Sequence, residues 1–305
     1  MTSLDQRLPA TRGDRVPLGI FFMVAATVMY AASTALSKWQ VASYSFAEVL
    51  FFRSFVSLIV VSVLILPRHG LAVFRTKRLR DHFGRSLTQT AAQSMILIAL
   101  SLMPIAGAMA INFSAPLFAT LFAALWLNEK VGWARGLALL VGFCGVLIVA
   151  APGADSFRIG ALFALANAVL YGSVTAAVRG MTTTESTQTL TMYQMLFMTV
   201  FFLLALPLFG FAWPNGHDAA AMITAGIFNG FGQYWWTRAL SLAPPAAVGP
   251  FYYFSLVWAM ILGFVFWGDI PGVSLLFGSA IVVGSGLFLL WHETGKNGKE
   301  PLPAD

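Results

Sequence analysis

The feature that most limits how this chain can fold is a series of long apolar stretches, separated by short charged, Pro-containing or Gly-containing segments. A helix needs about 20 apolar residues to cross the hydrocarbon core of a bilayer. The whole chain is 58% hydrophobic and only 10% charged, whereas soluble domains are about 25% charged. We therefore predict an all-α integral membrane protein with ten transmembrane helices. The predicted spans are Pro17–Lys38, Phe46–Leu66, Ser86–Leu102, Ile105–Leu127, Trp133–Ala151, Ile159–Val178, Leu190–Phe209, Ala219–Leu242, Ala246–Trp267 and Val273–Trp291.

Lys and Arg are distributed unevenly between the two sides that these spans define. If residues 1–16 are cytoplasmic, only Lys38, Arg53 and Arg158 of the 18 Lys and Arg residues fall away from the cytoplasmic side. Cytoplasmic loops of membrane proteins carry the excess of basic residues, so we expect both tails, residues 1–16 and 292–305, to be cytoplasmic. The basic loop after the second span fits this topology signal better than a site for acidic lipid or nucleic acid.

The second half of the chain repeats the first. The helix Gly19–Lys38 returns as Gly160–Arg179, with apolar, small and aromatic residues in matching positions. The segment Ala99–Pro104 (Ala-Leu-Ser-Leu-Met-Pro) returns as Ala239–Pro244 (Ala-Leu-Ser-Leu-Ala-Pro), and each copy ends one helix just before the next begins. The sequence therefore predicts an internal duplication.

Each copy of the repeat contains five predicted helices, an odd number. The second copy must therefore enter the membrane with the opposite orientation, which is the inverted-repeat architecture of many secondary transporters. We predict a first repeat at residues 17–151 and a second, inverted repeat at residues 159–291. A substrate site is expected near the middle of the membrane, between the two repeats.

Polar side chains at helical spacing mark the faces that point into the protein, because a polar group in hydrocarbon is costly. Tyr30 and Thr34 lie one turn apart in the first span, and the sixth span repeats this pair. The candidate substrate-cavity residues are Tyr30, Thr34, Gln89, Gln93, Asn112, Tyr171, Thr175, Asn229, Gln233, Tyr252 and Tyr253. For the amide stripes, which in the eighth span include Gly226 and Gly230, the alternative is helix packing through hydrogen bonds and small residues.

Three basic residues are candidates for charge contacts. Arg53 is the deepest charge in any predicted span. It either has a structural role, pairing with Glu48 or extending outward, or it receives a substrate carboxylate. Lys38 and Arg179 are equivalent in the two repeats, so inversion places them at opposite ends of the protein, and we expect each near a different mouth of the cavity.

No motif for metal binding, nucleotide binding or hydrolytic catalysis occurs in the sequence. No carboxylate lies deep in a predicted span, so a proton relay through a buried Asp or Glu is not expected. We accordingly expect no enzymatic activity, no metal and no cofactor.

The ten spans, the inverted repeats, the two Ala-Leu-Ser-Leu-x-Pro turns and the Leu-Asn-Glu-Lys sequence at 127–130, followed by Gly136 and Gly142, resemble the drug/metabolite transporter superfamily with two EamA-type domains. The resemblance extends from Pro17 to Trp291. The second copy departs from the pattern where Asn-Glu becomes Gly268-Asp269. Within the superfamily the chain is most similar to bacterial amino-acid exporters of the YddG type.

This resemblance implies a multi-pass protein of the bacterial inner membrane, with a cavity lined by the first, third, fourth, sixth, eighth and ninth helices. It implies alternating access and export of aromatic and other neutral amino acids. The alternatives are transport of a nucleotide derivative, a sugar derivative or a lipophilic cation, and a non-transport membrane scaffold. The expected partners are a small-molecule substrate and the lipid bilayer, without nucleic acid. Monomer and homodimer stay open, since small-residue faces on the fifth and tenth spans permit a dimer.

Overall fold

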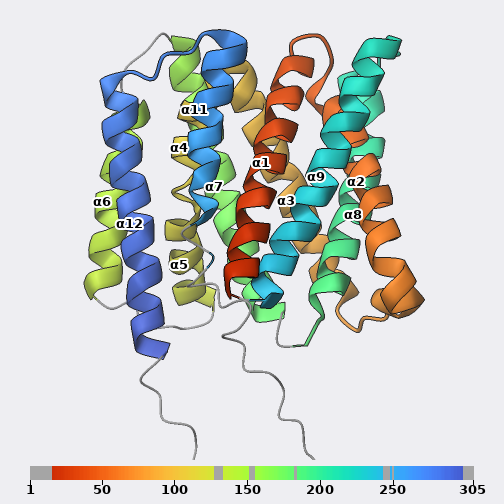
Figure 1. Cartoon of the computed structure of the whole chain (residues 1–305), viewed down its shortest axis with the longest axis horizontal. Helices are drawn as coiled ribbons and strands as arrows, with labels where there is room; N and C mark the ends of the chain where they lie inside the picture. The colour runs from red at the N-terminus through yellow and green to blue at the C-terminus, as the bar shows by residue number, and fades with distance from the viewer. Residues whose placement is uncertain are drawn as a thin grey trace, which may run out of the picture.

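The computed structural model describes residues 16–126, 133–150, 155–181, 184–242, 248 and 251–297, and in these ranges it contains helices and no strand (Figure 1). The elements are α1 (Val16–Gln40), α2 (Phe46–His69), the 3-10 helix η2 (Gly70–Phe74), α3 (Leu79–Leu102), α4 (Ile105–Asn112), α5 (Ala115–Trp126), α6 (Trp133–Ala150), α7 (Asp155–Met181), α8 (Thr187–Phe209), α9 (Gly216–Leu242), α11 (Phe254–Trp267) and α12 (Val273–Asn297). The predicted boundaries Leu127, Ala151 and Ala246 lie outside the described residues.

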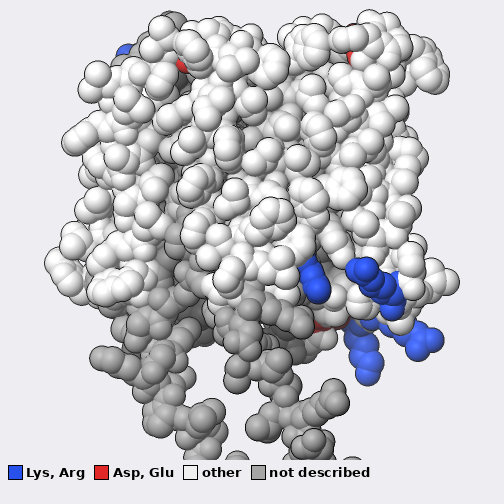
Figure 2. All heavy atoms as spheres, viewed as in Figure 1, with Lys and Arg blue, Asp and Glu red and all other residues white. Residues whose placement is uncertain are grey.

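The described chain begins and ends on the same side of the bundle. α1 starts and α12 finishes at the lower end in Figure 1. Most of the Lys and Arg side chains visible in Figure 2 gather at this lower end. The lower end is therefore the cytoplasmic one, and the predicted orientation, with both termini inside, is confirmed.

The second repeat is inverted relative to the first. α1 rises from the cytoplasmic end, whereas its counterpart α7 descends toward it, and the following helices alternate accordingly (Figure 1). The main contacts between the repeats obey the same relation, since α1 packs on α9 while α7 packs on α3. The predicted fold, ten transmembrane helices in two inverted repeats of five, is confirmed.

The outer surfaces of the helices are apolar. Five described helical segments are long and apolar enough to cross a membrane, and shorter apolar helices occur in α6, α11 and α12. Large side chains such as Val63, Leu162, Leu204 and Phe266 are exposed on the bundle. Such a surface is costly in water but matches the hydrocarbon of a bilayer, so lipid is the solvent for which this fold is built.

The predicted fourth span is broken in the middle of the membrane. α4 ends at Asn112 and α5 begins at Ala115. At the break, the Ser114 N–H donates to the Ile111 carbonyl over 3.0 Å. Pro116 has no N–H, so the carbonyl of Asn112 loses its helical donor. The structure has a two-residue turn here, at Phe113 and Ser114, which separates α4 from α5 inside the bundle.

Small residues let α6 and α12 approach closely. A Cβ added at Gly278 would lie 2.6 Å from Val149 Cγ2 and 2.8 Å from the Gly145 carbonyl oxygen. Gly278 therefore does not tolerate a side chain unless its neighbours on α6 move. The small-residue faces of the predicted fifth and tenth spans are therefore used against each other within one chain, and they give no argument for a dimer.

Candidate functional site

Three tyrosines from different parts of the chain meet near the middle of the bundle. The Tyr30 hydroxyl of α1 donates to Gln233 Oε1 of α9 over 2.8 Å. Tyr171 in α7 and Tyr252, two residues before α11, lie near the same hydroxyl. Gly232 allows the Tyr30 ring to lie against α9, since a Cβ there would be 3.1 Å from Tyr30 Cδ1. Tyr30 of the first repeat thus contacts α9 of the second and lies near two further tyrosines of the second repeat.

A buried arginine joins this group of aromatic and amide side chains. Arg53 of α2 donates from Nη2 to Gln93 Oε1 of α3 over 2.5 Å, and its Nη1 lies 3.5 Å from Ser37 Oγ. The guanidinium also interacts electrostatically with Tyr30. We refer to Tyr30, Arg53, Gln93, Tyr171, Gln233 and Tyr252 as the central cluster.

Glu48 is not the hydrogen-bond partner of Arg53. Its Oε2 accepts a hydrogen bond of 3.1 Å from the backbone N–H of Ala212, at the outer end of the bundle. Arg53 instead donates to the uncharged acceptors of α1 and α3. The structure therefore does not bear out the predicted Arg53–Glu48 pair, and it leaves the guanidinium charge without neutralisation by Glu48.

The central cluster has the chemistry of a binding site. Tyrosine rings offer apolar faces and polar edges, the two glutamine amides both donate and accept, and arginine only donates. None of the six residues is a carboxylate, a thiol or an imidazole. The cluster therefore combines flat apolar surfaces with hydrogen-bonding groups, and its six residues include no nucleophile paired with a base.

A sequence profile described as the EamA-like transporter family matches residues 17–151 and again residues 158–291. The chain belongs to this family. The predicted superfamily is thereby confirmed, and the protein is a multi-pass membrane transporter of the bacterial inner membrane.

Relatives of this EamA-family transporter are named for several solutes. It is 29% identical over 301 residues to a protein of Rhizobium johnstonii named riboflavin transporter, covering 98% of this chain and 99% of the relative. It is 26% identical over 280 residues to an S-adenosylmethionine uptake transporter of Rickettsia felis, covering 90% and 93%. A crystal structure with 21% identity superimposes with a TM-score of 0.64, covering 93% of this chain and 99% of the other, which supports the fold alone. These names do not support the expected amino-acid specificity or the expected direction of export.

The polar stripe of α9 divides between two neighbours. Asn229 Nδ2 donates to Ser57 Oγ of α2 over 2.9 Å. A Cβ at Gly230 would lie 2.8 Å from Val60 Cβ, also on α2. Of these three α9 residues, only Gln233 belongs to the central cluster. Asn229 therefore contributes to the α2–α9 contact, and its expected place in the cavity stays a prediction.

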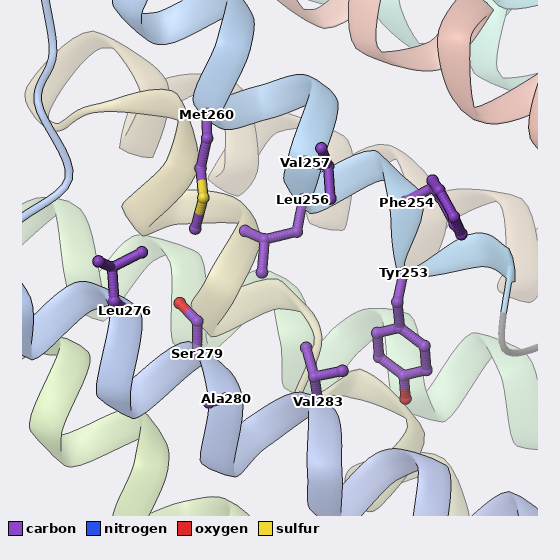
Figure 3. Close-up of a pocket in the computed structure, with 9 residues that line it drawn as sticks. All are labelled: Tyr253, Phe254, Leu256, Val257, Met260, Leu276, Ser279, Ala280 and Val283. Carbon is purple, nitrogen blue, oxygen red and sulfur yellow. The ribbon is translucent and has the colours of Figure 1, made fainter.

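Tyr253 packs against α12. In Figure 3 its ring extends from the start of α11 toward α12, and a Cβ at Gly286 would collide with its hydroxyl. Tyr253 lines a pocket of about 380 Å³ between α11 and α12, in which the other lining residues are apolar except Ser279. Although adjacent in sequence to Tyr252, Tyr253 is placed in helix packing.

Two asparagines form a hydrogen bond at the break between α4 and α5. Asn167 Nδ2 of α7 donates to Asn112 Oδ1 over 2.6 Å, and Asn167 is buried. Asn112 is among the predicted site residues, whereas Asn167 is not. The sequence did contain a signal for Asn167, because it lies four residues before Tyr171, on the same helical face.

The remaining predicted cavity residues lie on the helices that carry the cluster. Gln89 is buried in α3, one turn before Gln93, and Thr34 is half-buried in α1, one turn after Tyr30. Thr175 is exposed, and its hydroxyl donates to the carbonyl of Tyr171 over 2.9 Å. Among the described residues, no hydrogen bond joins these three side chains to the side chains of the cluster, so their predicted role stays a prediction.

Lys38 connects the two repeats at the outer end. Its Nζ donates to the Met103 carbonyl over 2.7 Å and lies 5.2 Å from the centroid of the Trp267 ring. It also interacts electrostatically with Asp269. Lys38 thus links the outer ends of α1, α3 and α11. Its counterpart Arg179 lies near the cytoplasmic end of α7, and its side chain is outside the described part of the structure.

Proposed function

We propose that this transporter carries a small solute with a planar aromatic ring system, of the flavin type, through the central cluster by alternating access. The observation that carries the proposal is the hydrogen bond from Tyr30 to Gln233, with Tyr171 and Tyr252 close to the same Tyr30 hydroxyl. These residues come from both repeats, so a solute bound among them would contact both halves that must rock against each other.

The chemistry of a flavin fits this cluster. Its fused rings present a flat apolar face for stacking on tyrosine, and its pyrimidine edge carries both donors and acceptors, which an amide can match. Gln93, Gln233 and Arg53 supply such groups beside the rings. The name of the Rhizobium relative supports the same solute class.

S-Adenosylmethionine fits less well. It carries a sulfonium cation, and a cationic solute calls for a carboxylate or an open aromatic cage. The buried charge of the cluster is instead the guanidinium of Arg53, which repels a cation. The charge of the site therefore favours a neutral or anionic solute.

A second candidate substrate is an aromatic amino acid, exported from the cell. The observation that favours it is Arg53, whose hydrogen-bond partners Gln93 and Ser37 are neutral. A substrate carboxylate would then provide the missing negative charge through a bidentate contact. The same tyrosines would receive the aromatic side chain.

Flux measurements on liposomes containing only this protein distinguish the candidates. Labelled riboflavin, tryptophan and S-adenosylmethionine are offered in parallel, and we expect saturable flux of riboflavin. Flux of tryptophan without riboflavin would favour the second candidate. Absence of flux for all three would overturn the proposal.

Replacement of Arg53 provides a further distinction. Arg53→Gln removes the charge while keeping hydrogen-bonding capacity. A substrate held by its carboxylate should lose nearly all flux, whereas a neutral flavin should lose only part. Asn229→Ala, on the α2–α9 contact, serves as a matched control that leaves the cluster intact.

A further inference from the structure

A pocket distinct from the central cluster lies where α2 ends, α8 begins and α9 approaches its end. It has a volume of about 120 Å³, and its lining includes Arg68 of α2, Gln188 of α8, and Tyr234 and Arg238 of α9. We call it the α2–α8–α9 pocket. These helix ends lie at the lower right in Figure 1, where Lys and Arg gather in Figure 2. The pocket is therefore at the level of the inner-leaflet headgroups.

Hydrogen-bond donors converge on this pocket. Arg68 Nη1 donates to the Tyr234 hydroxyl over 3.1 Å, which orients the guanidinium toward α9 and leaves the tyrosine proton available to another acceptor. Thr237 is three residues further along the same face of α9, and its hydroxyl oxygen is buried without a hydrogen-bond partner in the structure. Buried hydroxyls are normally satisfied, so this grouping suits a ligand rich in acceptors.

The electrostatics of the pocket favour an anion. None of its ten lining residues is Asp or Glu, while two are arginines. The first turn of α8 also faces it through Thr187 and Gln188, and the N-terminal end of a helix carries a partial positive charge. A phosphate group supplies both the negative charge and several acceptor oxygens.

The pocket combines this polar wall with an apolar one. Leu64 and Ile65, one turn before Arg68 on α2, line it as well. A free phosphate gains nothing from apolar contact, whereas a phospholipid places its phosphate directly beside its acyl chains. Basic pockets between transmembrane helices on the cytoplasmic side suit acidic lipid headgroups.

We propose that the α2–α8–α9 pocket binds the phosphate of an acidic phospholipid of the inner leaflet, with Arg68 and Arg238 as its charge partners and Tyr234 and Thr237 as hydroxyl donors. The site is separate from the solute site in the central cluster. With this ligand, the arginines at this part of the cytoplasmic surface have a binding role. The sequence alone indicates only that their basic charge marks the cytoplasmic side.

Lipid binding by the full-length protein, purified in detergent, tests this proposal. Native mass spectrometry with added phosphatidylglycerol and phosphatidylcholine of equal chain length measures the apparent affinity for each. We expect Arg68→Gln/Arg238→Gln to weaken phosphatidylglycerol binding by about tenfold or more and to leave phosphatidylcholine binding unchanged. The matched control is Arg75→Gln/Lys77→Gln, which removes the same charge from exposed positions in the loop after α2. Equal losses in the two double variants would overturn a defined site.

Two further measurements are needed. One distinguishes binding in the pocket from a general effect of positive charge, and the other distinguishes a lipid ligand from free phosphate. Thr237→Val removes only the buried hydroxyl, keeps the net charge, and should weaken phosphatidylglycerol binding while the protein stays folded. Inorganic phosphate should fail to displace the lipid. Displacement by phosphate, an unchanged Thr237→Val variant or equal affinity for the two lipids would each overturn the proposal.

Discussion

Gln233 and Asn229 are amides one turn apart on α9, yet they have different partners. Gln233 accepts a hydrogen bond from Tyr30 in the central cluster, whereas Asn229 donates to Ser57 of α2. We expect Gln233→Ala to lower flux in liposomes up to about tenfold, the value of one neutral hydrogen bond, without loss of folded protein. Asn229→Ala should instead lower the melting temperature and preserve substrate affinity. The reverse pattern would show that the cluster is not the solute site.

His82 makes the stability of the cytoplasmic end dependent on pH. It lies in the first turn of α3, before the predicted span, is fully buried, and its ring centroid is 4.6 Å from that of Tyr193. Burial is the main cause that lowers the pKa of His82, and the charge of Arg85 lowers it further, while Glu185 and Asp81 oppose the shift. The folded protein therefore favours neutral His82.

The sign of the effect follows from linkage. The unfolded chain protonates His82 near its ordinary pKa of about 6.5, whereas the folded chain resists protonation to lower pH. Stability is thus present above that value and lost as the pH falls below it. We expect the melting temperature in detergent to fall between about pH 7.5 and about pH 5.5, and to fall less in His82→Gln. An equal fall in both proteins would assign the pH dependence to other groups.

At the scale of helices, replacing each of two glycines on α12 by alanine should have opposite effects on stability. Gly278 faces Val149 and Gly145 of α6, where an added Cβ is too close, whereas a Cβ at Gly284 would meet nothing within 4 Å. Gly278→Ala should destabilise the protein by about 1–3 kcal/mol through overpacking. Gly284→Ala should leave the melting temperature unchanged or slightly raised, because Ala favours helix. A similar loss in both variants would mean that helix propensity, not the α6–α12 contact, decides stability here.

The positions and directions of the helices could be predicted from the sequence. Which neighbouring helix each face contacts could be predicted only in part. Apolar length sets where spans lie, and the count of basic residues sets their direction, so the inverted repeats were predictable. A polar stripe does not reveal which neighbour it meets. Gln233 and Asn229 share a face in sequence, and only packing shows that α2 covers one and α1 the other.

The same limit applies to the aromatic residues and to the break in the fourth span. Tyr252 and Tyr253 are consecutive, so their side chains leave the backbone in different directions, and Tyr253 fills the space that Gly286 leaves on α12. Pro116 predicts a disturbed helix, but a kink and a full break leave the same local signature. Asn167 was missed because a lone amide in an apolar helix gains meaning only when its partner Asn112 is located.

At the scale of the whole molecule, the two repeats meet at the outer end through Lys38. At the outer end, Lys38 of the first repeat contacts Trp267 of the second and also the end of α3. Alternating access requires the outer ends to separate when the site opens outward. The contact between Lys38 and Trp267 must break in that state, so it favours the state in which the outer end is closed.

Removing the charge of Lys38 should therefore shift the transporter toward the outward-open state. We expect Lys38→Met to increase access from outside to a cysteine placed one turn deeper by Thr34→Cys, in a Cys144→Ser background. The cation–π contact with Trp267, which joins the two repeats, is worth about 0.5–2 kcal/mol, so the labelling rate by an impermeant maleimide should rise by about two- to thirtyfold. Lys38→Arg should preserve the slow rate. Arg179→Met, at the equivalent position of the inverted repeat, should leave labelling from outside unchanged, and an equal rise in that variant would contradict a gate specific to the outer end.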